Sequence, residues 1–166
     1  MLAIGIDPGT ATTGYGFVRR DDAGELIAVD WGVILTAPDQ SPSDRLVQIY
    51  KALNKLLKKQ KPECAAVESL FFQRNVRTAM SVGQARGVVL LALQQAGIPS
   101  YDYNPNQVKQ AVSGYGAADK RQMQAMVQTL LRLPELPRPD DAADALAVAI
   151  CHLNTQRTQQ AIASAS

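Results

Sequence analysis

Residues 2–10 read LAIGIDPGT, a short apolar run that stops at an acid and a turn dipeptide. Such a run predicts a buried β-strand over Leu2–Ile6 that ends in a turn at Pro8 and Gly9. An acid that terminates a core strand lies at the carboxyl edge of the sheet, where open α/β sheets bind their ligands. Asp7 is therefore the first candidate functional residue.

The residues that follow predict two more strands and then an alternation of strands and helices. A polar turn at 20–24 separates candidate strands at 14–19 and 25–35, so the first three strands form an antiparallel meander. Apolar periodicity and capping residues predict a helix at 41–61, a strand at 64–67, a helix at 76–96, a strand at 98–103, and helices at 106–112, 120–131 and 140–154. The predicted fold is α/β, a five-stranded mixed sheet flanked by helices, with parallel later strands and with strands one and four side by side.

The length of 166 residues predicts one domain. We expect this domain to span residues 1–155 and residues 156–166 to form a frayed tail, because the tail carries no apolar period. The two cysteines have no CxxC spacing, and the longest uncharged apolar run, Val88–Leu93, is too short to cross a bilayer. These features favour a cytoplasmic protein without disulfides, a zinc site or a membrane segment.

Positive charge is concentrated in the middle of the chain. The formal net charge is only +2, but residues 69–132 contain seven basic and two acidic residues, a local net charge of +5. The basic residues are Arg74, Arg77, Arg86, Lys109, Lys120, Arg121 and Arg132. Such a segment is able to contact a polyanion.

Four acidic residues have neighbours that are unusual for solvated surface carboxylates. Asp7 and Glu68 each end an apolar strand, and Asp141 and Asp144 lie three positions apart in the helical sequence DDAADALA. Residues at that spacing are separated by about 60° around a helix and share one face. If this face packs on the carboxyl edge of the sheet, four carboxylates converge, and their repulsion is relieved by cations. An all-oxygen set suits Mg²⁺ or Mn²⁺, and two such ions about 4 Å apart are a known device for phosphodiester cleavage.

A plainer interpretation of Asp7 and Asp141 remains open. Asp-Pro-Gly is a common turn, and Asp140 or Asp141 could simply cap the last helix. Asp144 fits this interpretation less well, because it lies inside the helix on an alanine face where an uncompensated charge is costly.

Six blocks of sequence occur together in a specific order. They are IGIDPGT with TGYG at 4–16, Val67-Glu68 followed by Phe71, GQARG at 83–87, QVKQ at 107–110, ADK at 118–120, and DAADALA at 141–147. In this order the blocks resemble RuvC-type Holliday-junction resolvases, and the resemblance extends from about residue 2 to 152.

The resemblance implies a ribonuclease H-like fold and a homodimeric endonuclease of DNA recombination and repair. Such an enzyme makes paired, symmetric nicks at four-way DNA junctions and leaves 5′-phosphate and 3′-hydroxyl ends. The resemblance places the family's metal ligands at Asp7, Glu68, Asp141 and Asp144, with two Mg²⁺ ions per subunit for which Mn²⁺ can substitute. It also implies cooperation with the RuvA–RuvB branch-migration complex.

Further DNA contacts are expected outside the four acids. Phe71 matches the aromatic residue that wedges into the junction in this family, and Phe72 is a second candidate, although both rings could instead pack in a local core. The resemblance supports phosphate contacts by Lys109 and Lys120. Four arginines are candidates on charge alone, with a solvated basic face as the alternative: Arg74, Arg77, Arg86 and Arg121.

Other functions compete with junction cleavage. A non-catalytic protein could bind branched DNA for a partner, and a ribonuclease H-like nuclease of the YqgF type could act on another nucleic acid. ATPases of the actin or sugar-kinase type share the Asp-x-Gly-Thr-like hairpin, but they bind nucleotide between two such domains and this chain has room for one.

Two further features leave alternatives open. Gly83, Ala85 and Gly87 permit close helix packing, either within the subunit or across a dimer interface. His152 lies eight residues, roughly 12 Å along a helix, beyond Asp144, so core packing or a surface position is expected rather than a metal role.

Overall fold

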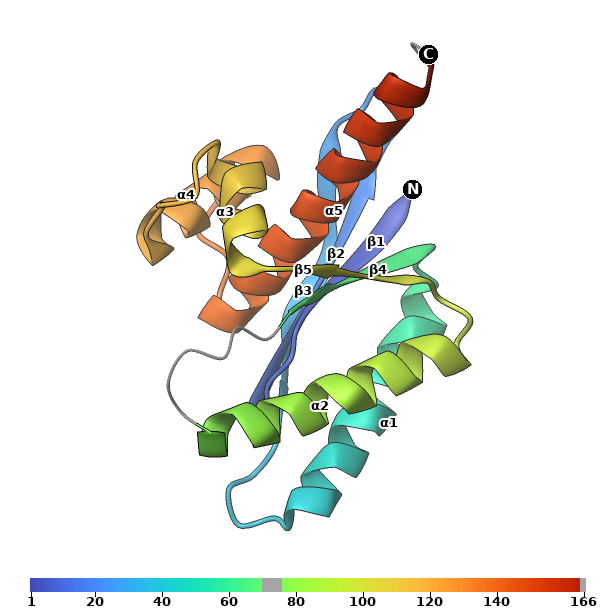
Figure 1. Cartoon of the computed structure of the whole chain (residues 1–166), viewed down its shortest axis with the longest axis vertical. Helices are drawn as coiled ribbons and strands as arrows, with labels where there is room; N and C mark the ends of the chain where they lie inside the picture. Colours follow the sequence, from blue (N-terminus) through green and yellow to red (C-terminus); the bar gives the residue numbers. More distant parts are fainter. Residues whose placement is uncertain (70–75, 165–166) are drawn as a thin grey trace.

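The computed structural model describes residues 1–69 and 76–164, which contain one five-stranded mixed sheet (Figure 1). The strands are β1 (Leu2–Asp7), β2 (Thr12–Arg20), β3 (Leu26–Leu35), β4 (Cys64–Glu68) and β5 (Ser100–Tyr103). Their order is β3-β2-β1-β4-β5. The first three strands are antiparallel, β4 is parallel to β1, and β5 is parallel to β4. The predicted meander and the pairing of strands one and four are confirmed.

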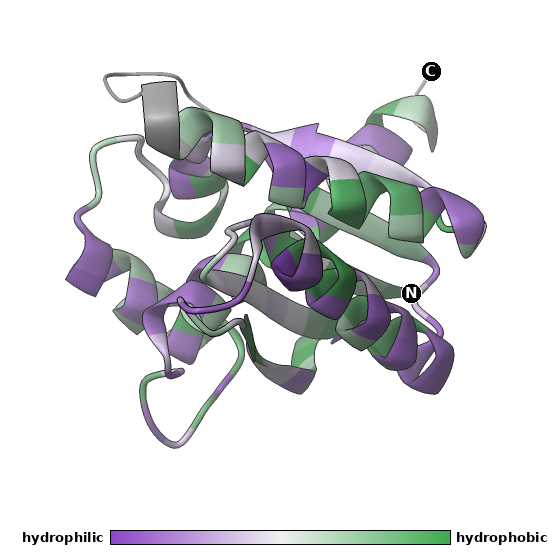
Figure 2. Ribbon diagram, turned by 90° about the horizontal axis from the view of Figure 1, so that it is seen from below, coloured by the Kyte–Doolittle hydropathy of each residue, from purple (hydrophilic) through white to green (hydrophobic). Residues whose placement is uncertain are grey.

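Five helices cover the two faces of the sheet in the described residues. They are α1 (Pro42–Gln60), α2 (Val76–Gln95), α3 (Pro105–Ser113), α4 (Lys120–Leu130) and α5 (Asp140–Ser164). Helices α1 and α2 lie on one face, and α3, α4 and α5 lie on the other (Figure 1). Figure 2 shows the second half of α2 as one of the most hydrophobic helical segments.

Alternate residues of the central strands bury themselves in two separate cores. Ala3 and Cys64 belong to the core under α5, whereas Ile4 and Ala65 belong to the core under α1 and α2. Both faces of the central strands are therefore buried, which explains the uninterrupted apolar runs of β1 and β4. Both cysteines are buried and free.

Side-chain caps set the starts of three helices. Ser41, Asn104 and Asp119 each accept a hydrogen bond from a backbone N–H in the first turn of α1, α3 and α4, respectively. In α3 and α4 the cap is reciprocal, because a glutamine at the third helical position accepts from the backbone of the capping residue. These caps hold the first turns that carry Lys120 and precede Lys109.

Glycines on β1 and β2 let α5 lie directly on the sheet. A Cβ atom added to Gly5 would lie 2.0 Å from the carbonyl oxygen of Ala145, and one added to Gly14 would lie 2.0 Å from that of Asp141. Gly5 pairs with Gly16, so the cleared strip crosses both strands. Close approach therefore places the first turns of α5 against the carboxyl end of β1.

The last helix differs from its expected length. It continues to Ser164, so residues 156–164 are helical where the sequence predicted a frayed tail. Threonine hydroxyls of the added turns donate to backbone carbonyls, from Thr155 to Cys151 at 2.8 Å and from Thr158 to Asn154 at 3.1 Å. The alanines and glutamines there favour helix without an apolar period, which is why periodicity missed the extension. The domain boundary at residue 155 stays a prediction.

The hydropathy of the helices indicates whether any of them could span a membrane. Within residues 1–69 and 76–164, no helix has both the length and the apolar character needed to span a bilayer.

Candidate active site

Asp7 and Glu68 lie side by side at the carboxyl edge of the sheet. They end β1 and β4, and these strands are parallel neighbours with Ile6 opposite Val67. Both residues are half-buried, and after burial the charge of Glu68 is one of the causes that raise the pKa of Asp7. Like charges at neighbouring strand ends favour the protonated form of one of the pair.

Asp141 and Asp144 reach the same edge from α5. The backbone of Asp141 lies against Gly14, and Gly14 is the partner of Asp7 in the β1–β2 register. The negative charges of Asp144 and Asp141 contribute to the raised pKa of Asp7. The structure therefore brings the four predicted acids to one edge.

The alternative that an aspartate caps α5 does not describe the start of this helix. The carbonyl oxygen of Pro139 accepts hydrogen bonds from the backbone N–H groups of Ala142 and Ala143. Asp140 and Asp141 lie in the first helical turn, so Pro139 stands at the position before the helix. Both carboxyl groups are free for other contacts.

Burial and like charges raise the pKa of three acids of this site, Asp7, Glu68 and Asp144. Burial, then the charge of Glu68, raises the pKa of Asp7 to about 8. Burial also raises the pKa of Glu68 and of Asp144, although the Lys120 ammonium partly opposes the shift at Asp144. Protons thus relieve a repulsion that cations could relieve instead.

Lys120 already neutralises part of this charge. Its ammonium lies 3.1 Å from a carboxylate oxygen of Asp140 and 3.6 Å from one of Asp144. The second oxygen of Asp140 accepts a hydrogen bond of 2.8 Å from the Gln124 amide. Lys120 therefore stands between an acid of the predicted set and Asp140, which sequence reasoning considered only as a cap.

The donor set suits divalent cations of the magnesium type. Among the described residues, no three His, Cys, Asp or Glu side chains are arranged so that they could hold one ion. Asp144 instead forms an ion pair with Lys120, and burial raises the pKa of both Asp7 and Glu68. Magnesium keeps several of its waters and needs only one or two carboxylates, so these paired acids fit hydrated Mg²⁺ once their protons leave. The role of the four acids as ligands stays a prediction.

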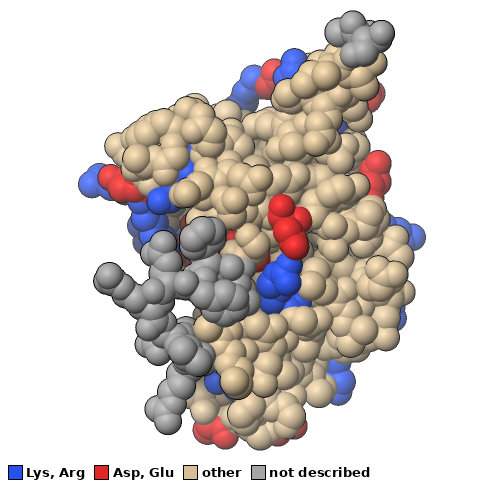
Figure 3. All heavy atoms as spheres, viewed as in Figure 1, with Lys and Arg blue, Asp and Glu red and all other residues tan. Residues whose placement is uncertain are grey.

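A cavity of about 220 Å³ adjoins these acids. Glu68, Asp144, Lys109 and Lys120 line it together with Pro105, Val108, Met123 and Ala147. The structure thus brings both predicted lysines beside two of the predicted acids. Arg121 is exposed on α4 and is not among the residues that line this cavity. Figure 3 shows Lys and Arg side chains gathered over α4 at the left of this face.

The remaining predicted contacts belong to the sequence between β4 and the middle of α2. Arg77 lies in the first turn of α2, and Phe71, Phe72 and Arg74 lie outside the described residues. Arg86, another member of the basic segment, forms an ion pair of 2.7 Å with Asp102 of β5. Its charge is therefore engaged within the subunit.

His152 is fully buried, which agrees with core packing, one of the two positions expected from the sequence. Its Nδ1 atom lies 2.9 Å from the Tyr103 hydroxyl, and the ring of Tyr101 stacks on it with a centroid distance of 4.6 Å. Burial lowers the pKa of His152. This histidine is a core residue.

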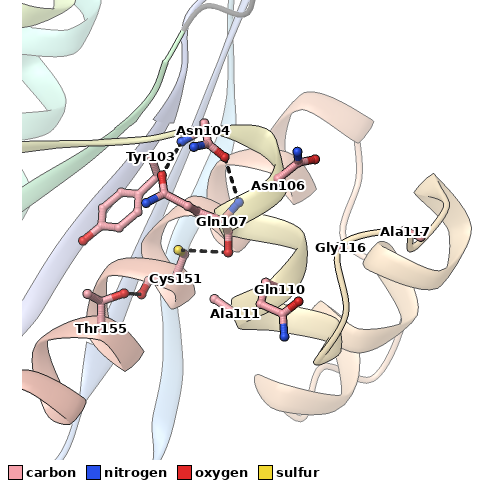
Figure 4. A pocket seen from close by; sticks show the side chains of 10 residues that line it. All are labelled: Tyr103, Asn104, Asn106, Gln107, Gln110, Ala111, Gly116, Ala117, Cys151 and Thr155. Carbon is pink, nitrogen blue, oxygen red and sulfur yellow. Dashed lines mark hydrogen bonds between the residues drawn. The ribbon is translucent and has the colours of Figure 1, made fainter.

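A larger open groove of about 910 Å³ lies between α3 and α5, away from the acids (Figure 4). Amide, hydroxyl and small side chains line it. Asn104 and Gln107 are engaged in the cap of α3, and the Cys151 thiol donates to the Gln107 carbonyl. Because these polar groups already have partners, we assign the groove no ligand.

The raised pKa of Asp7 predicts how stability depends on pH. The folded chain holds a proton at Asp7 up to about pH 8, whereas the ordinary pKa is 3.8. This stabilisation is present at low pH and is lost as the pH rises through the folded-state pKa. The metal-free protein is therefore expected to lose stability between pH 3.8 and about 8, and Asp7→Asn is expected to remove that part of the loss.

Urea unfolding in the presence of a chelator, at about pH 5 and about pH 8, measures this effect. Asp22→Asn, in an exposed turn, is the matched control and should keep the pH dependence of the original protein. Equal pH dependence in Asp7→Asn and the original protein would contradict the prediction.

Comparisons with known proteins cover nearly the whole chain. The model of a family described as crossover junction endodeoxyribonuclease RuvC matches residues 3–152. A Chloroflexus aggregans protein of the same description is 59% identical over 160 residues, 96% of this chain and 97% of the relative.

Two solved structures from Thermus thermophilus are similar in three dimensions. The structure of RuvC is 39% identical with a TM-score of 0.88, and it covers 96% of this chain and 97% of its own. The structure of RuvC in complex with Holliday junction substrate is 37% identical with a TM-score of 0.87, covering 95% and 96%. The residues matched by the family model include the parts of β1, β4 and α5 that carry the four acids.

Proposed function

Because this chain belongs to the family of RuvC crossover junction endodeoxyribonucleases, we propose that it resolves four-way DNA junctions by paired, symmetric nicks. Its five-stranded mixed sheet with flanking helices is the ribonuclease H-like fold of that family. The observation that carries the proposal is the meeting of Asp7, Glu68 and Asp144 at one edge, beside Lys109 and Lys120. The positive charge of residues 69–132 suits a DNA substrate.

Four carboxylates would hold the metal ions of the reaction. Asp7, Glu68, Asp141 and Asp144 are the proposed ligands, and the proton that the raised pKa favours at Asp7 would leave when the ions bind. When bound, two Mg²⁺ ions, or Mn²⁺ in their place, supply an activated water and neutralise the charge that develops on the phosphate.

The two lysines position the phosphate. Lys109 and Lys120 are able to donate to its non-bridging oxygens from the cavity that Glu68 and Asp144 also line. Asp140 keeps the ammonium of Lys120 at this edge. In-line attack of water then leaves a 5′-phosphate and a 3′-hydroxyl, which a ligase can join.

Nicking of a synthetic four-way junction with Mg²⁺ tests the proposed function. Two symmetric cuts with ligatable ends are expected, with little cleavage of linear duplex or RNA–DNA hybrid. Preferential cleavage of another nucleic acid would support the YqgF-type alternative. Tight junction binding without nicking would support the non-catalytic alternative.

Contacts from the segment after β4 complete the proposed DNA surface. Phe71 follows Glu68 by three residues, so its ring could stack on an unpaired base at the crossover, an interaction worth about 1 to 3 kcal/mol. Phe72, Arg74 and Arg77 are proposed as additional contacts, and Arg121 as one from α4. Their place in the sequence supports this role, because Phe72, Arg74 and Arg77 follow Glu68 within nine residues and Arg121 follows Lys120 directly.

Helix α2 supports the proposal of a homodimer. Met80, Gln84, Gly87 and Leu91 share one exposed face of α2, at helical spacing, with Met80 67% and Leu91 52% exposed. Ala85 faces the core instead. A Cβ on Gly87 would meet nothing within 4 Å, so packing within the subunit does not require glycine there. Glycine inside a helix nevertheless costs about 0.5–1 kcal/mol of stability relative to alanine. We propose that this face packs on its copy across a two-fold axis, which presents two active sites to two strands.

Leu91→Glu is expected to weaken the dimer at least about 100-fold, because each interface would bury two new charges and lose two leucines. Sedimentation measures association, and a cruciform plasmid measures the cuts, since paired nicks linearise it and single nicks leave an open circle. Ile27→Glu on β3, where Ile27 is 45% exposed, is the control. Unchanged dimerisation of Leu91→Glu would place the interface elsewhere.

The family relationship also supports a cellular setting. We propose that the protein acts in the cytoplasm, in DNA recombination and repair, together with the RuvA–RuvB branch-migration complex.

A further inference from the structure

A second hollow borders the acids on the side of Asp141. It has a volume of about 820 Å³. Gln124, Leu136, Pro137, Arg138, Pro139, Asp140 and Asp141 line it. The connector between α4 and α5 forms one wall, and the first turn of α5 forms another. This hollow and the 220 Å³ cavity adjoin different members of the acid set, Asp141 for the first and Glu68 with Asp144 for the second.

Arg138 is the cation that lines this hollow. Its side chain is exposed, and it takes part in none of the ion pairs formed among residues 1–69 and 76–164. Pro137 and Pro139 flank it, and proline restricts both its own backbone and that of the residue before it. Arg138 therefore projects from a stiff segment and has a guanidinium free to bind an anion.

The acids of the hollow do not satisfy this arginine. Asp140 is held by Lys120 at 3.1 Å and by Gln124 at 2.8 Å. Asp141 lies in the first turn of α5 over Gly14, at the catalytic edge. After Lys120 and Gln124, the charge of Arg138 is one of those that lower the pKa of Asp140, but among the described residues neither acid forms an ion pair with Arg138. The N–H donors of its guanidinium are thus left for a ligand from outside the chain.

We infer that this hollow binds the backbone of the cut DNA strand, with Arg138 on a phosphate beyond the scissile one. The inference rests on the proposed function, because it needs the scissile phosphate at the four acids. A strand centred there has the cavity of Lys109 and Lys120 beside Glu68 and Asp144, and the hollow of Arg138 beside Asp141. We take these as the two directions in which the strand continues. A guanidinium offers two parallel N–H donors to phosphate oxygens, so it fixes the path of the strand as well as its charge. Such contacts set register without reading bases.

Junction binding without metal, measured by fluorescence anisotropy over a range of salt concentrations, tests the charge. Arg138→Gln is expected to weaken binding about 3- to 10-fold at low salt and to reduce the slope of log K against log salt by about 0.9, as for one lost phosphate contact. Lys55→Gln, with the same change in charge on the exposed side of α1, should leave the slope unchanged. Arg138→Lys should largely retain the slope. Equal slopes in Arg138→Gln and the original protein would overturn the inference.

Single methylphosphonates along the cut strand test the position. Each neutralises one phosphate, so affinity falls wherever the protein contacts that phosphate. In Arg138→Gln, neutralising one particular phosphate should no longer lower the affinity. In Lys109→Ala the same should hold for a different phosphate, on the opposite side of the scissile bond. No such phosphate, or one on the same side, would overturn the inference. Absence of nicking by the original protein would overturn the proposed function and the inference with it, whereas normal nicking with unaltered Arg138→Gln binding would overturn the inference alone.

Discussion

Asp7→Asn is expected to lower the rate of junction nicking by at least about 1000-fold, or about 4 kcal/mol of transition-state stabilisation. Glu68→Gln, Asp141→Asn and Asp144→Asn should behave alike. The physical reason is that an amide keeps the size of the side chain but cannot balance the charge of a divalent cation. Asp7 should show the effect most clearly, because its carboxyl group is the one whose pKa is raised to about 8 by burial and by its acidic neighbours.

Binding should change in the opposite direction from cleavage. Removing a negative charge from the catalytic edge reduces repulsion of phosphate, so junction affinity in each variant is expected to be equal to or higher than that of the original protein. Single-turnover nicking and anisotropy with the same junction measure the two effects. Asp39→Asn, an exposed acid before α1, is the control and should nick normally. Normal nicking by any one of the four variants would remove that residue from the proposed ligand set.

Gly14→Ala is expected to cost about 3 kcal/mol or more of folding stability and to abolish nicking in the protein that still folds. The new Cβ would lie 2.0 Å from the carbonyl oxygen and 2.6 Å from the carbonyl carbon of Asp141. These are backbone atoms, so relief requires a shift of α5, which displaces Asp141 and Asp144 from Asp7 and Glu68. Both the packing and the site depend on this one close approach.

Urea unfolding and junction nicking check this expectation. Gly116→Ala is the matched control, because a Cβ there meets nothing within 4 Å, and it should retain stability and activity. Measuring Gly14→Ala at a temperature where circular dichroism shows it to be folded separates loss of the site from loss of the fold. A Gly14→Ala protein as stable and active as the original would contradict the close packing of α5 on β2.

Much of the fold could be predicted from local pattern. The strand over Leu2–Ile6 and its terminal acid follow from an apolar run that stops at a turn, and α1 begins after Ser41 as its cap predicts. The end of α5 could not be predicted in this way, since residues 155–164 have helix-favouring composition but no apolar period. Periodicity reports burial, and these turns are mostly exposed.

The candidate site was predictable in its residues and less so in its contacts. The positions of Asp7 and Glu68 at strand ends, and of Asp141 and Asp144 on one helix face, are readable because each depends on a few neighbouring residues. The bridge from Lys120 to Asp140 and Asp144 joins α4 to α5, and no local pattern signals it. Arg138, which forms no ion pair within the part of the chain that the structure describes, has the local sequence of an ordinary surface arginine, and only the hollow beside it in the fold distinguishes it.

The amino-acid sequence by itself determined the order of strands and helices, the four acids and the family, because apolar period, capping and motif spacing act within a few residues. Only the tertiary structure decided which charges meet, how far Asp7 is desolvated, and that Gly87 faces outward while Ala85 faces the core. Those properties depend on distances between groups that are far apart along the chain, and it is the packing of α5 and α2 on the sheet that sets them.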